Sequence, residues 1–273
     1  MRERPEKLFH YTNLQSLALI LKNETIRLMP LTGLDDPQEN QTADIQNLGR
    51  FFFASCWTSD SDESIPMWNM YASLESGVRI SLPPCPFKRY KGTQEGYAAA
   101  TGLPIDHICI EGEQYTFLPI KDLASGIMSP QALNGNGILQ KIIYTDDKSL
   151  LEPKISSDDS WSLDFGNFGK VKNTKWEFQH EWRYLMLIFP FDVFGQLDNL
   201  PERFANVHHG IVCGSLPSAC PYYDLKIDHD LLSQIEIVPS PKMSSGNRVL
   251  LDSLLKQYGM SGRIMKSELI GLL

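Results

Sequence analysis

The stretch TKWEFQHEWRYLMLIF, Thr174–Phe189, is typical of a buried β-strand because aromatic and apolar residues fill most of it. Successive side chains of a strand point to opposite faces of the sheet. Four polar residues therefore share one predicted face: Glu177, Gln179, Glu181 and Arg183. The other predicted face holds Phe178, Trp182, Tyr184 and Met186. Polar groups on so apolar a strand need either each other or a ligand.

Short runs of apolar and aromatic residues predict further strands outside this stretch. These runs cover 7–13, 25–29, 50–57, 77–82, 140–147, 208–214 and 235–241. Apolar residues at helical spacing predict helices at 13–23, 67–75 and 247–259. The predicted apolar stripe of the last helix consists of Val249, Leu250, Leu254 and Leu255. Strands outnumber helices and do not alternate regularly with them, which favours an α+β fold over a doubly wound parallel sheet.

The chain has 273 residues, of which 42% are hydrophobic, and this suits a globular protein with a sizeable core. We interpret residues 1–273 as a single domain. Residues 83–139 mix glycine and proline with polar groups, and 150–175 is largely polar. Both ranges are predicted to be insertions or long loops.

The cysteine content and the N-terminus indicate a cytoplasmic protein. The first residues, MRERPEKLFHYTN, are charged and lack the apolar region of a secretory signal. Five cysteines without a CxxC pair are typical of reduced cytosolic thiols. No apolar run is long enough to span a bilayer, so no membrane partner is expected.

The charge distribution argues against a broad nucleic-acid surface. The formal net charge is -8, and basic residues cluster only at 88–91 and 170–175. A small nucleic-acid substrate is not excluded. His208 and His209 have no third ligand at a recognisable spacing, so no metal is expected. The sequence also lacks a P-loop, a GxGxxG motif and a nucleophile elbow.

Candidate ligand-binding residues occur near the ends of the early strands. His10, Tyr11 and Thr12 offer donors, acceptors and a ring that could stack on a ligand. The same tripeptide also fits a strand end that leads into a helix cap, which is the more ordinary interpretation. Ser55 lies near the end of an apolar strand. It either lines a pocket there or belongs to a strand end that leaves the core for solvent.

Two further groups of residues have open interpretations. Trp68 and Tyr71 lie on a predicted short helix, where aromatic residues usually join the core, but their polar tips seek partners. Glu181 and Arg183 form either an internal salt bridge or a catalytic carboxylate held by an arginine. A buried carboxylate must be paired or must shift its pKa.

Several strings, taken together and in order, resemble a bacterial family known as domain of unknown function 2971. They are FHYTN, LDDPQEN, PMWNMYASLESGVRISL, KIIYTDD and EFQHEWRYLM, and they span about two-thirds of the chain. The sequence departs from that family at Asp35, where asparagine is preferred, and at Gln179, where a second glutamate is preferred.

A weaker resemblance concerns function. The order His-x-Thr, a hydroxyl-bearing strand end and a late Gln-x-Glu is similar to ADP-ribosyltransferases. This resemblance implies a split, twisted, mostly antiparallel β-core. It also implies that His10 and Thr12 anchor NAD, that Ser55 lines the pocket and that Tyr71 stacks on nicotinamide. Gln179 would orient the acceptor, and Arg183 would keep the catalytic carboxylate, Glu181, ionised or pair with a pyrophosphate.

Two functional hypotheses follow. In the first, the protein is an NAD-consuming ADP-ribosyltransferase-like enzyme, such as a bacterial toxin or an anti-phage defence effector, that modifies an unknown macromolecular acceptor. In the second, it is a non-catalytic nucleotide- or partner-binding domain in a defence or regulatory system. Glu181 and Arg183 then form a structural ion pair, and the aromatic residues belong to the core.

Overall fold

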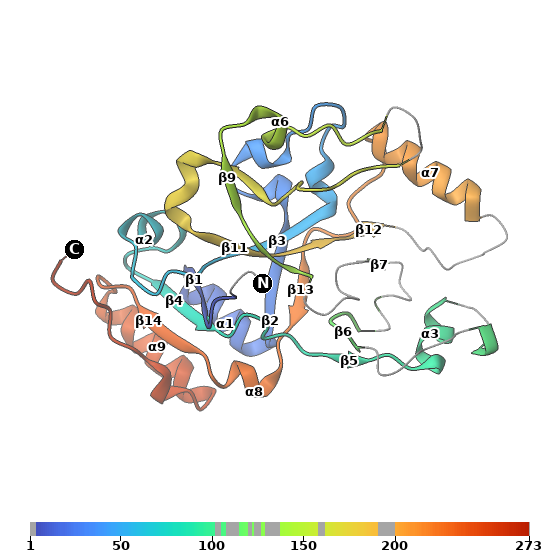
Figure 1. The fold of residues 1–273 in the computed structure, drawn as a ribbon. Coiled ribbons are helices and arrows are strands. Elements are labelled where there is room, and N and C mark those ends of the chain that lie inside the picture. Colours follow the sequence, from blue (N-terminus) through green and yellow to red (C-terminus); the bar gives the residue numbers. More distant parts are fainter. Residues whose placement is uncertain are drawn as a thin grey trace.

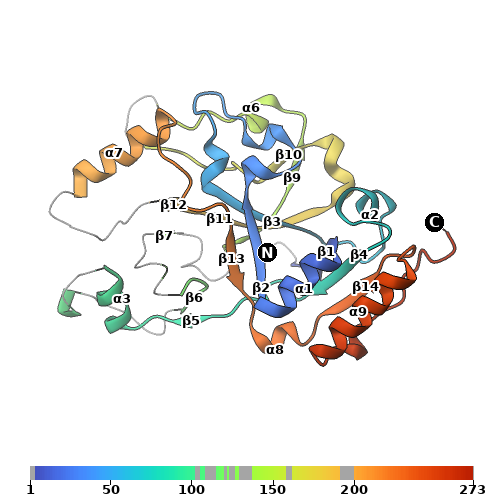
Figure 2. The same cartoon turned by 180° about the vertical axis from the view of Figure 1, so that it is seen from behind.

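The structure is a computed structural model that describes residues 4–101, 105–107, 115–119, 122, 127–128, 137–157, 162–190 and 200–272. It has a mixed α/β fold with one main antiparallel sheet of eight strands and several short helices (Figures 1 and 2). This confirms the α+β class. The sheet contains β1 (Leu8–Asn13), β2 (Thr25–Pro30), β3 (Phe52–Thr58), β4 (Gly77–Leu82), β8 (Leu139–Lys141), β11 (Glu181–Leu187), β13 (Tyr223–Lys226) and β14 (Glu236–Pro239).

Strand β3 is the centre of the sheet, and one of its edges is divided between two partners. Along one edge β11 pairs with all of β3, from Glu181 opposite Thr58 to Leu187 opposite Phe52. On the other edge β2 pairs only with Phe53 and Ala54, and β1 pairs only with Thr58. The strands β1 and β2 therefore separate beside Ser55–Trp57. This split in the sheet is the feature that positions the candidate site.

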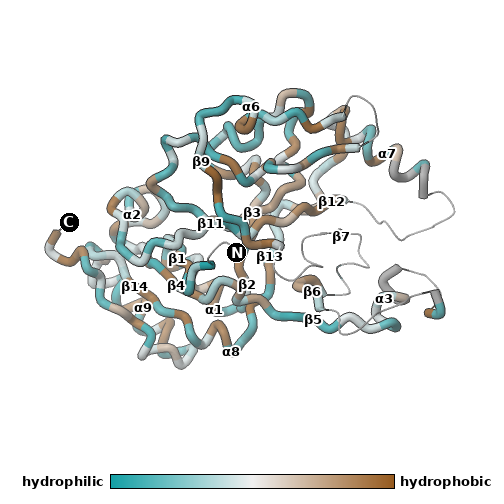
Figure 3. The backbone as a smooth tube through the Cα atoms, viewed as in Figure 1, coloured by the Kyte–Doolittle hydropathy of each residue, from teal (hydrophilic) through white to brown (hydrophobic). Residues whose placement is uncertain are grey.

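The two faces of the sheet are covered by different apolar clusters. Trp182, Tyr184 and Met186 of β11 join the larger cluster, together with residues of β4, α1 (Leu14–Asn23) and α9 (Ser245–Gln257). Leu185 and Leu187 join a second cluster, with residues of η1 (Leu31–Gly33) and η3 (Leu48–Phe51). Brown segments in Figure 3 mark hydrophobic residues near β3, at the centre of the sheet, and near β13, at its edge. The predicted alternation of faces is therefore confirmed within β11.

The first part of Thr174–Phe189 is not a strand, and this part of the prediction is wrong. Residues Thr174–Gln179 form a 3-10 helix, η5, whose first turn is capped by the Asn173 side chain. His180 ends η5 in the left-handed region with a φ of 41°, and β11 begins at Glu181. The alternation of polar and apolar residues in η5 resembles that of a strand. In a 3-10 helix, however, such residues do not lie on two opposite faces, because there are three residues per turn.

Capping side chains fix the starts of the helices. Asn13 accepts a hydrogen bond from Ser16 N and begins α1 directly after β1. Ser64 caps α2 (Ile65–Tyr71), which has Pro66 in its first turn, where a missing N–H has no cost. Helix α1 follows the prediction, whereas α2 begins two residues before the predicted range 67–75 and ends at Tyr71, so 72–75 are not helical. Both views place α1 beside α9 and α8 (His229–Leu232) (Figures 1 and 2).

Two predictions in the C-terminal part are wrong. Residues 208–214 are not a strand, because α7 (Leu200–Val212) covers most of them. Helix α9 is present, but Leu251 and Leu255 form its buried stripe. Val249 and Leu250 are 63% and 59% exposed, so the predicted stripe points partly to solvent.

The two ranges predicted as insertions contain short elements. The described part of 83–139 holds β5 (Tyr90–Lys91), β6 (Tyr115–Thr116), β7 (Ile127–Met128) and α3 (Gln94–Thr101), and the rest lies outside the described residues. In 150–175, residues 158–161 lie outside them. The later part of that range forms β10 (Val171–Asn173), which pairs in parallel with β9 (Ile143–Thr145). The remaining elements are β12 (Phe189–Pro190), α6 (Lys148–Leu151), η2 (Pro37–Asn40), η4 (Ile105–His107) and η7 (Ser261–Arg263).

Candidate functional site

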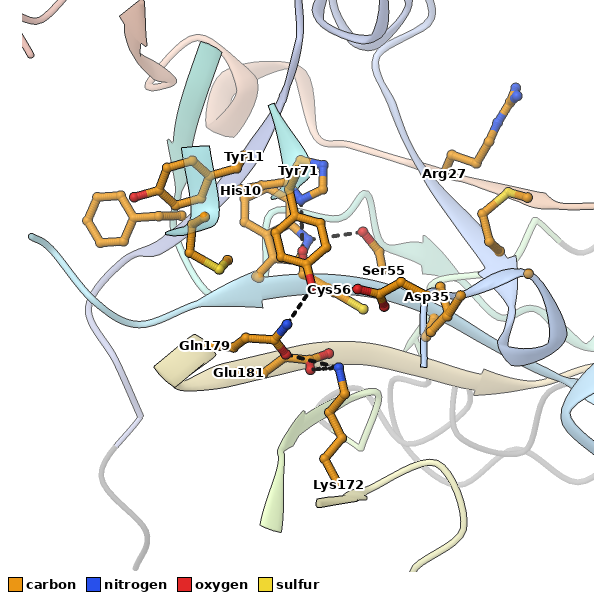
Figure 4. Close-up of a pocket in the computed structure, with 17 residues that line it drawn as sticks. His10, Tyr11, Arg27, Asp35, Ser55, Cys56, Tyr71, Lys172, Gln179 and Glu181 are labelled. Atoms are coloured by element: carbon orange, nitrogen blue, oxygen red, sulfur yellow. Dashed lines mark hydrogen bonds and ion pairs between the residues drawn. The ribbon is translucent and has the colours of Figure 1, made fainter. Parts of the chain in front are cut away.

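A cavity of about 390 Å³ lies where β1 and β2 separate beside β3. Apolar side chains make much of its wall: Phe9, Met29, Leu34, Ala54, Trp57 and Met67. Polar side chains enter from the same strands and from α2, β10, η5 and β11 (Figure 4). An apolar cavity of this size with a few convergent polar groups is the usual form of a small-molecule site.

A buried cluster of four charged residues lies at one wall of this cavity, and two of them, Lys172 and Glu181, line it. Arg183 donates from Nε and Nη2 to Glu181 Oε1, at 2.9 and 2.6 Å, and from Nη1 to Glu39 Oε2, at 2.5 Å. Lys172 Nζ lies 3.0 Å from Glu181 Oε2 and 2.9 Å from Glu39 Oε1. All four side chains are at most 3% exposed. We call this group the ionic tetrad; its two carboxylates and two cations balance.

The tetrad keeps Glu39 and Lys172 charged although both are buried. Burial alone would raise the pKa of Glu39, but Arg183 and Lys172 outweigh it and hold that pKa below its usual value. Burial would lower the pKa of Lys172, but Glu181 and Glu39 raise it above its usual value. Removing one member would leave an uncompensated buried charge, at a cost of about 3–5 kcal/mol.

A hydrogen-bond chain runs from the tetrad to the cavity mouth. Lys172 Nζ donates to Gln179 Oε1 at 2.9 Å, and Gln179 Nε2 donates to the Tyr71 hydroxyl. Tyr71 in turn donates to Asp35 Oδ2 at 2.6 Å. Burial, with Asp35 beside it, raises the pKa of Tyr71 above its usual value, so the hydroxyl keeps its proton. Figure 4 shows these side chains around one space.

His10 presents a defined tautomer to the cavity. Its Nδ1 lies 2.8 Å from the carbonyl oxygen of Cys56, and because a carbonyl only accepts, Nδ1 carries the proton. Burial lowers the pKa of His10, so the ring is neutral near pH 7. Its Nε2 is then a hydrogen-bond acceptor. The ring also lies against Trp57, with 5.0 Å between the ring centroids.

The cavity brings together most of the residues singled out in the sequence. Six of them line it: His10, Tyr11, Ser55, Tyr71, Gln179 and Glu181. They come from β1, β3, α2, η5 and β11, so the split in the sheet unites parts of the chain that are far apart. Ser55 Oγ accepts a hydrogen bond from Trp57 Nε1 at 3.1 Å.

Three predicted site residues do not reach this cavity. Thr12 lines a smaller neighbouring depression, of about 150 Å³, beside α1. Trp68 is fully buried and packs edge-on against Tyr11, so it belongs to the core. Arg183 is also fully buried and is committed to the tetrad. The predicted contact of Arg183 with a pyrophosphate is therefore wrong, because no ligand in the cavity reaches it.

Sequence reasoning missed Glu39, Lys172, Asp35 and Tyr144. Asp35 and Glu39 belong to the string LDDPQEN, which was noted only as a motif. Tyr144 belongs to the string KIIYTDD, and its hydroxyl accepts a hydrogen bond from Glu181 N at 2.8 Å. These strings converge on the same site, which is a signal that the sequence did contain. Lys172 lay in a basic run, where a solvent-exposed side chain is the ordinary expectation.

Within the described residues no group of histidine, cysteine and acidic side chains has the arrangement of a metal site. In the same part of the chain, no helix combines the length and the apolar character needed to cross a bilayer. Comparison of the chain with known protein families, with curated proteins and with solved structures found no match.

Proposed function

We propose that this protein is an ADP-ribosyltransferase-like enzyme that binds NAD in the cavity at the split and breaks its nicotinamide–ribose bond. One observation supports this most: His10, Tyr71, Gln179 and Glu181 line a single cavity between β1 and β2. The resemblance in the order of these residues assigns NAD binding to the first, ring stacking to the second and catalysis to the last pair.

Cleavage of the nicotinamide–ribose bond is favoured by a carboxylate near the reacting ribose. When the glycosidic C–N bond breaks, its electron pair moves to the nicotinamide ring, which leaves as a neutral molecule. The ribose becomes oxocarbenium-like and is captured by a nucleophile of the acceptor, which gives up a proton. A carboxylate that accepts from the ribose 2′-hydroxyl strengthens its hydrogen bond as this charge develops. We assign this role to Glu181.

The tetrad holds the Glu181 side chain in place between two cations. Arg183 occupies Oε1 with two N–H groups, and Lys172 donates to Oε2. A carboxylate oxygen accepts more than one hydrogen bond, so Oε2 retains capacity for a ligand hydroxyl. Gln179, fixed between Lys172 and Tyr71, then lies at the side of the cavity where an acceptor would approach.

Nicotinamide release from NAD in the presence of a bacterial lysate, with mass spectrometry of the lysate, tests the proposal. Wild type should release nicotinamide and modify a macromolecule, and Glu181→Gln should abolish both. Glu39→Gln is the matched control, because it removes the other carboxylate of the tetrad, which does not line the cavity. Equal losses in the two variants, at equal folded fractions, would assign Glu181 a structural role. No release by wild type would end the enzymatic proposal.

A second candidate is a non-catalytic nucleotide- or partner-binding domain. The observation that favours it is that both oxygens of Glu181 already have cationic partners and that the residue is 3% exposed. A thermal-shift screen with NAD, ADP-ribose and nucleotides separates the two, since ligand binding raises apparent stability. Binding without nicotinamide release would favour this second candidate. The acceptor, a role as toxin or anti-phage effector and a cytoplasmic location stay predictions.

A further inference from the structure

The charged side chains that line the cavity differ in how they are neutralised. Arg27 makes a two-point ion pair with Asp224, at 2.8 and 2.9 Å. Lys172 and Glu181 are balanced within the ionic tetrad. Asp35 has no cationic partner among the residues that the structure describes. The charged wall of the cavity therefore carries one negative charge that nothing in this part of the chain offsets.

The directions of the hydrogen bonds in the chain determine which oxygen of Asp35 is left for a ligand. Lys172 can only donate, so Gln179 turns its oxygen to Lys172 and its amide N–H to Tyr71. The Tyr71 hydroxyl accepts from Gln179 and has one proton, which it donates to Asp35 Oδ2. Asp35 is therefore the terminal acceptor of the chain. Its Oδ1 has no hydrogen-bond partner within the described ranges and is available to a ligand.

The surroundings favour a flat ligand. The half-buried ring of Tyr71 lines the same apolar cavity as Asp35 (Figure 4). The indole of Trp57 also lines it. Aromatic faces attract cations, and the attraction grows where water is excluded. An uncompensated carboxylate beside aromatic walls favours a ligand that is both planar and positively charged.

We propose that the cavity selects a positively charged planar ring and that Asp35 is the residue that distinguishes the charged ring from a neutral one. This inference rests on the proposed function, since it names the form in which a nicotinamide ring is bound. It adds a specificity-determining residue that is not the carboxylate assigned to bond breaking. Asp35 would favour the oxidised, cationic ring over the released neutral product.

The test compares two probes of nearly equal shape, the cation 1-methylnicotinamide and neutral nicotinamide, by isothermal titration calorimetry. Wild type should bind the cation about three- to thirtyfold more tightly. Asp35→Asn should lose most of this preference, keeping only the part that the aromatic rings supply, and its fold should persist because asparagine still accepts from Tyr71. Asp252→Asn, the same charge change on the exposed face of α9, should keep the wild-type preference.

Each result bears on the inference separately from the catalytic proposal. An undiminished preference in Asp35→Asn, equal affinity in wild type or no binding of either probe would overturn it. Loss of most of the preference in Asp35→Asn would sustain it, even if the wild type releases no nicotinamide from NAD. Because Asp35 is exposed, salt should also weaken the preference in wild type but not alter the affinities of Asp35→Asn.

Discussion

Lys172 Nζ lies 3.0 Å from Glu181 Oε2, and the two side chains are both only 3% exposed. Neither residue would be tolerated there alone, because an isolated buried charge is costly. Together with Glu39 and Arg183 they connect η2, β10 and β11. The candidate site is thus built on the interior of the protein, and its chemistry cannot be altered without affecting stability.

Lys172→Met should lower the free energy of unfolding by about 3–5 kcal/mol, because it leaves two buried carboxylates with a single cation. Urea denaturation followed by fluorescence measures the change. Lys175→Met is the control, since Lys175 is exposed and close in sequence. A similar, small effect in both variants would contradict the structural role of the tetrad.

Tyr71→Phe should lower the free energy of unfolding by about 1–3 kcal/mol, because the amide of Gln179, which is buried, loses its hydrogen-bond acceptor. Tyr258→Phe, near the end of α9, serves as the comparison and should change stability little. Chemical denaturation of both variants checks this. Unchanged stability of Tyr71→Phe would mean that Gln179 does not depend on the hydroxyl.

The stability of the protein should fall as the pH drops from 7 to 4. The pKa of His10 is lowered by burial, so the unfolded chain takes up a proton below about 6.5 while the folded ring resists it. The pKa of Glu39 is also lowered in the fold, so its contribution is complete above about 4.5 and is lost at lower pH. Asp36, whose pKa is raised by burial, opposes this trend in part.

Thermal unfolding of wild type and His10→Gln across this pH range distinguishes the contribution of His10 from that of Glu39. The variant should lose the dependence between pH 7 and about 5.5 and keep the steeper fall near pH 4. An identical profile in wild type and variant would show that His10 is not held neutral by the fold.

Asn13→Ala should destabilise the protein by about 0.5–2 kcal/mol, because it removes the cap of α1 directly after β1. Asn13→Ser should restore most of this stability, since serine supplies another capping oxygen. The midpoints of urea unfolding report both changes. Failure of serine to restore stability would indicate that asparagine acts through some other contact.

Strand positions could be predicted from local pattern, whereas the tetrad could not. An apolar run identified β3, and period-two alternation identified β11. The contact of Glu39 with Arg183 joins residues that are 144 positions apart, and no local pattern encodes such a distance. Local pattern also failed at Thr174–Gln179, where the same alternation fits a 3-10 turn.

The prediction of the buried face of α9 was wrong for a different reason. Its sequence contains two apolar stripes at helical spacing, Leu250 with Leu254 and Leu251 with Leu255. Only packing against the sheet and α1 decides between them, and the second stripe is the buried one. In the site, residue types identified Glu181 and Gln179, but which faces of which strands would meet depended on the split beside β3.

The pairing of β11 with β3 also has a consequence for synthesis on the ribosome. Thr58 emerges long before its partner Glu181, so one edge of the central strand has no partner through much of translation. An unpaired apolar edge is prone to association with other chains. The cavity wall is likewise incomplete until η5 and β11 have left the exit tunnel. A nascent chain should therefore be inert towards ligand and prone to association until β11 has emerged.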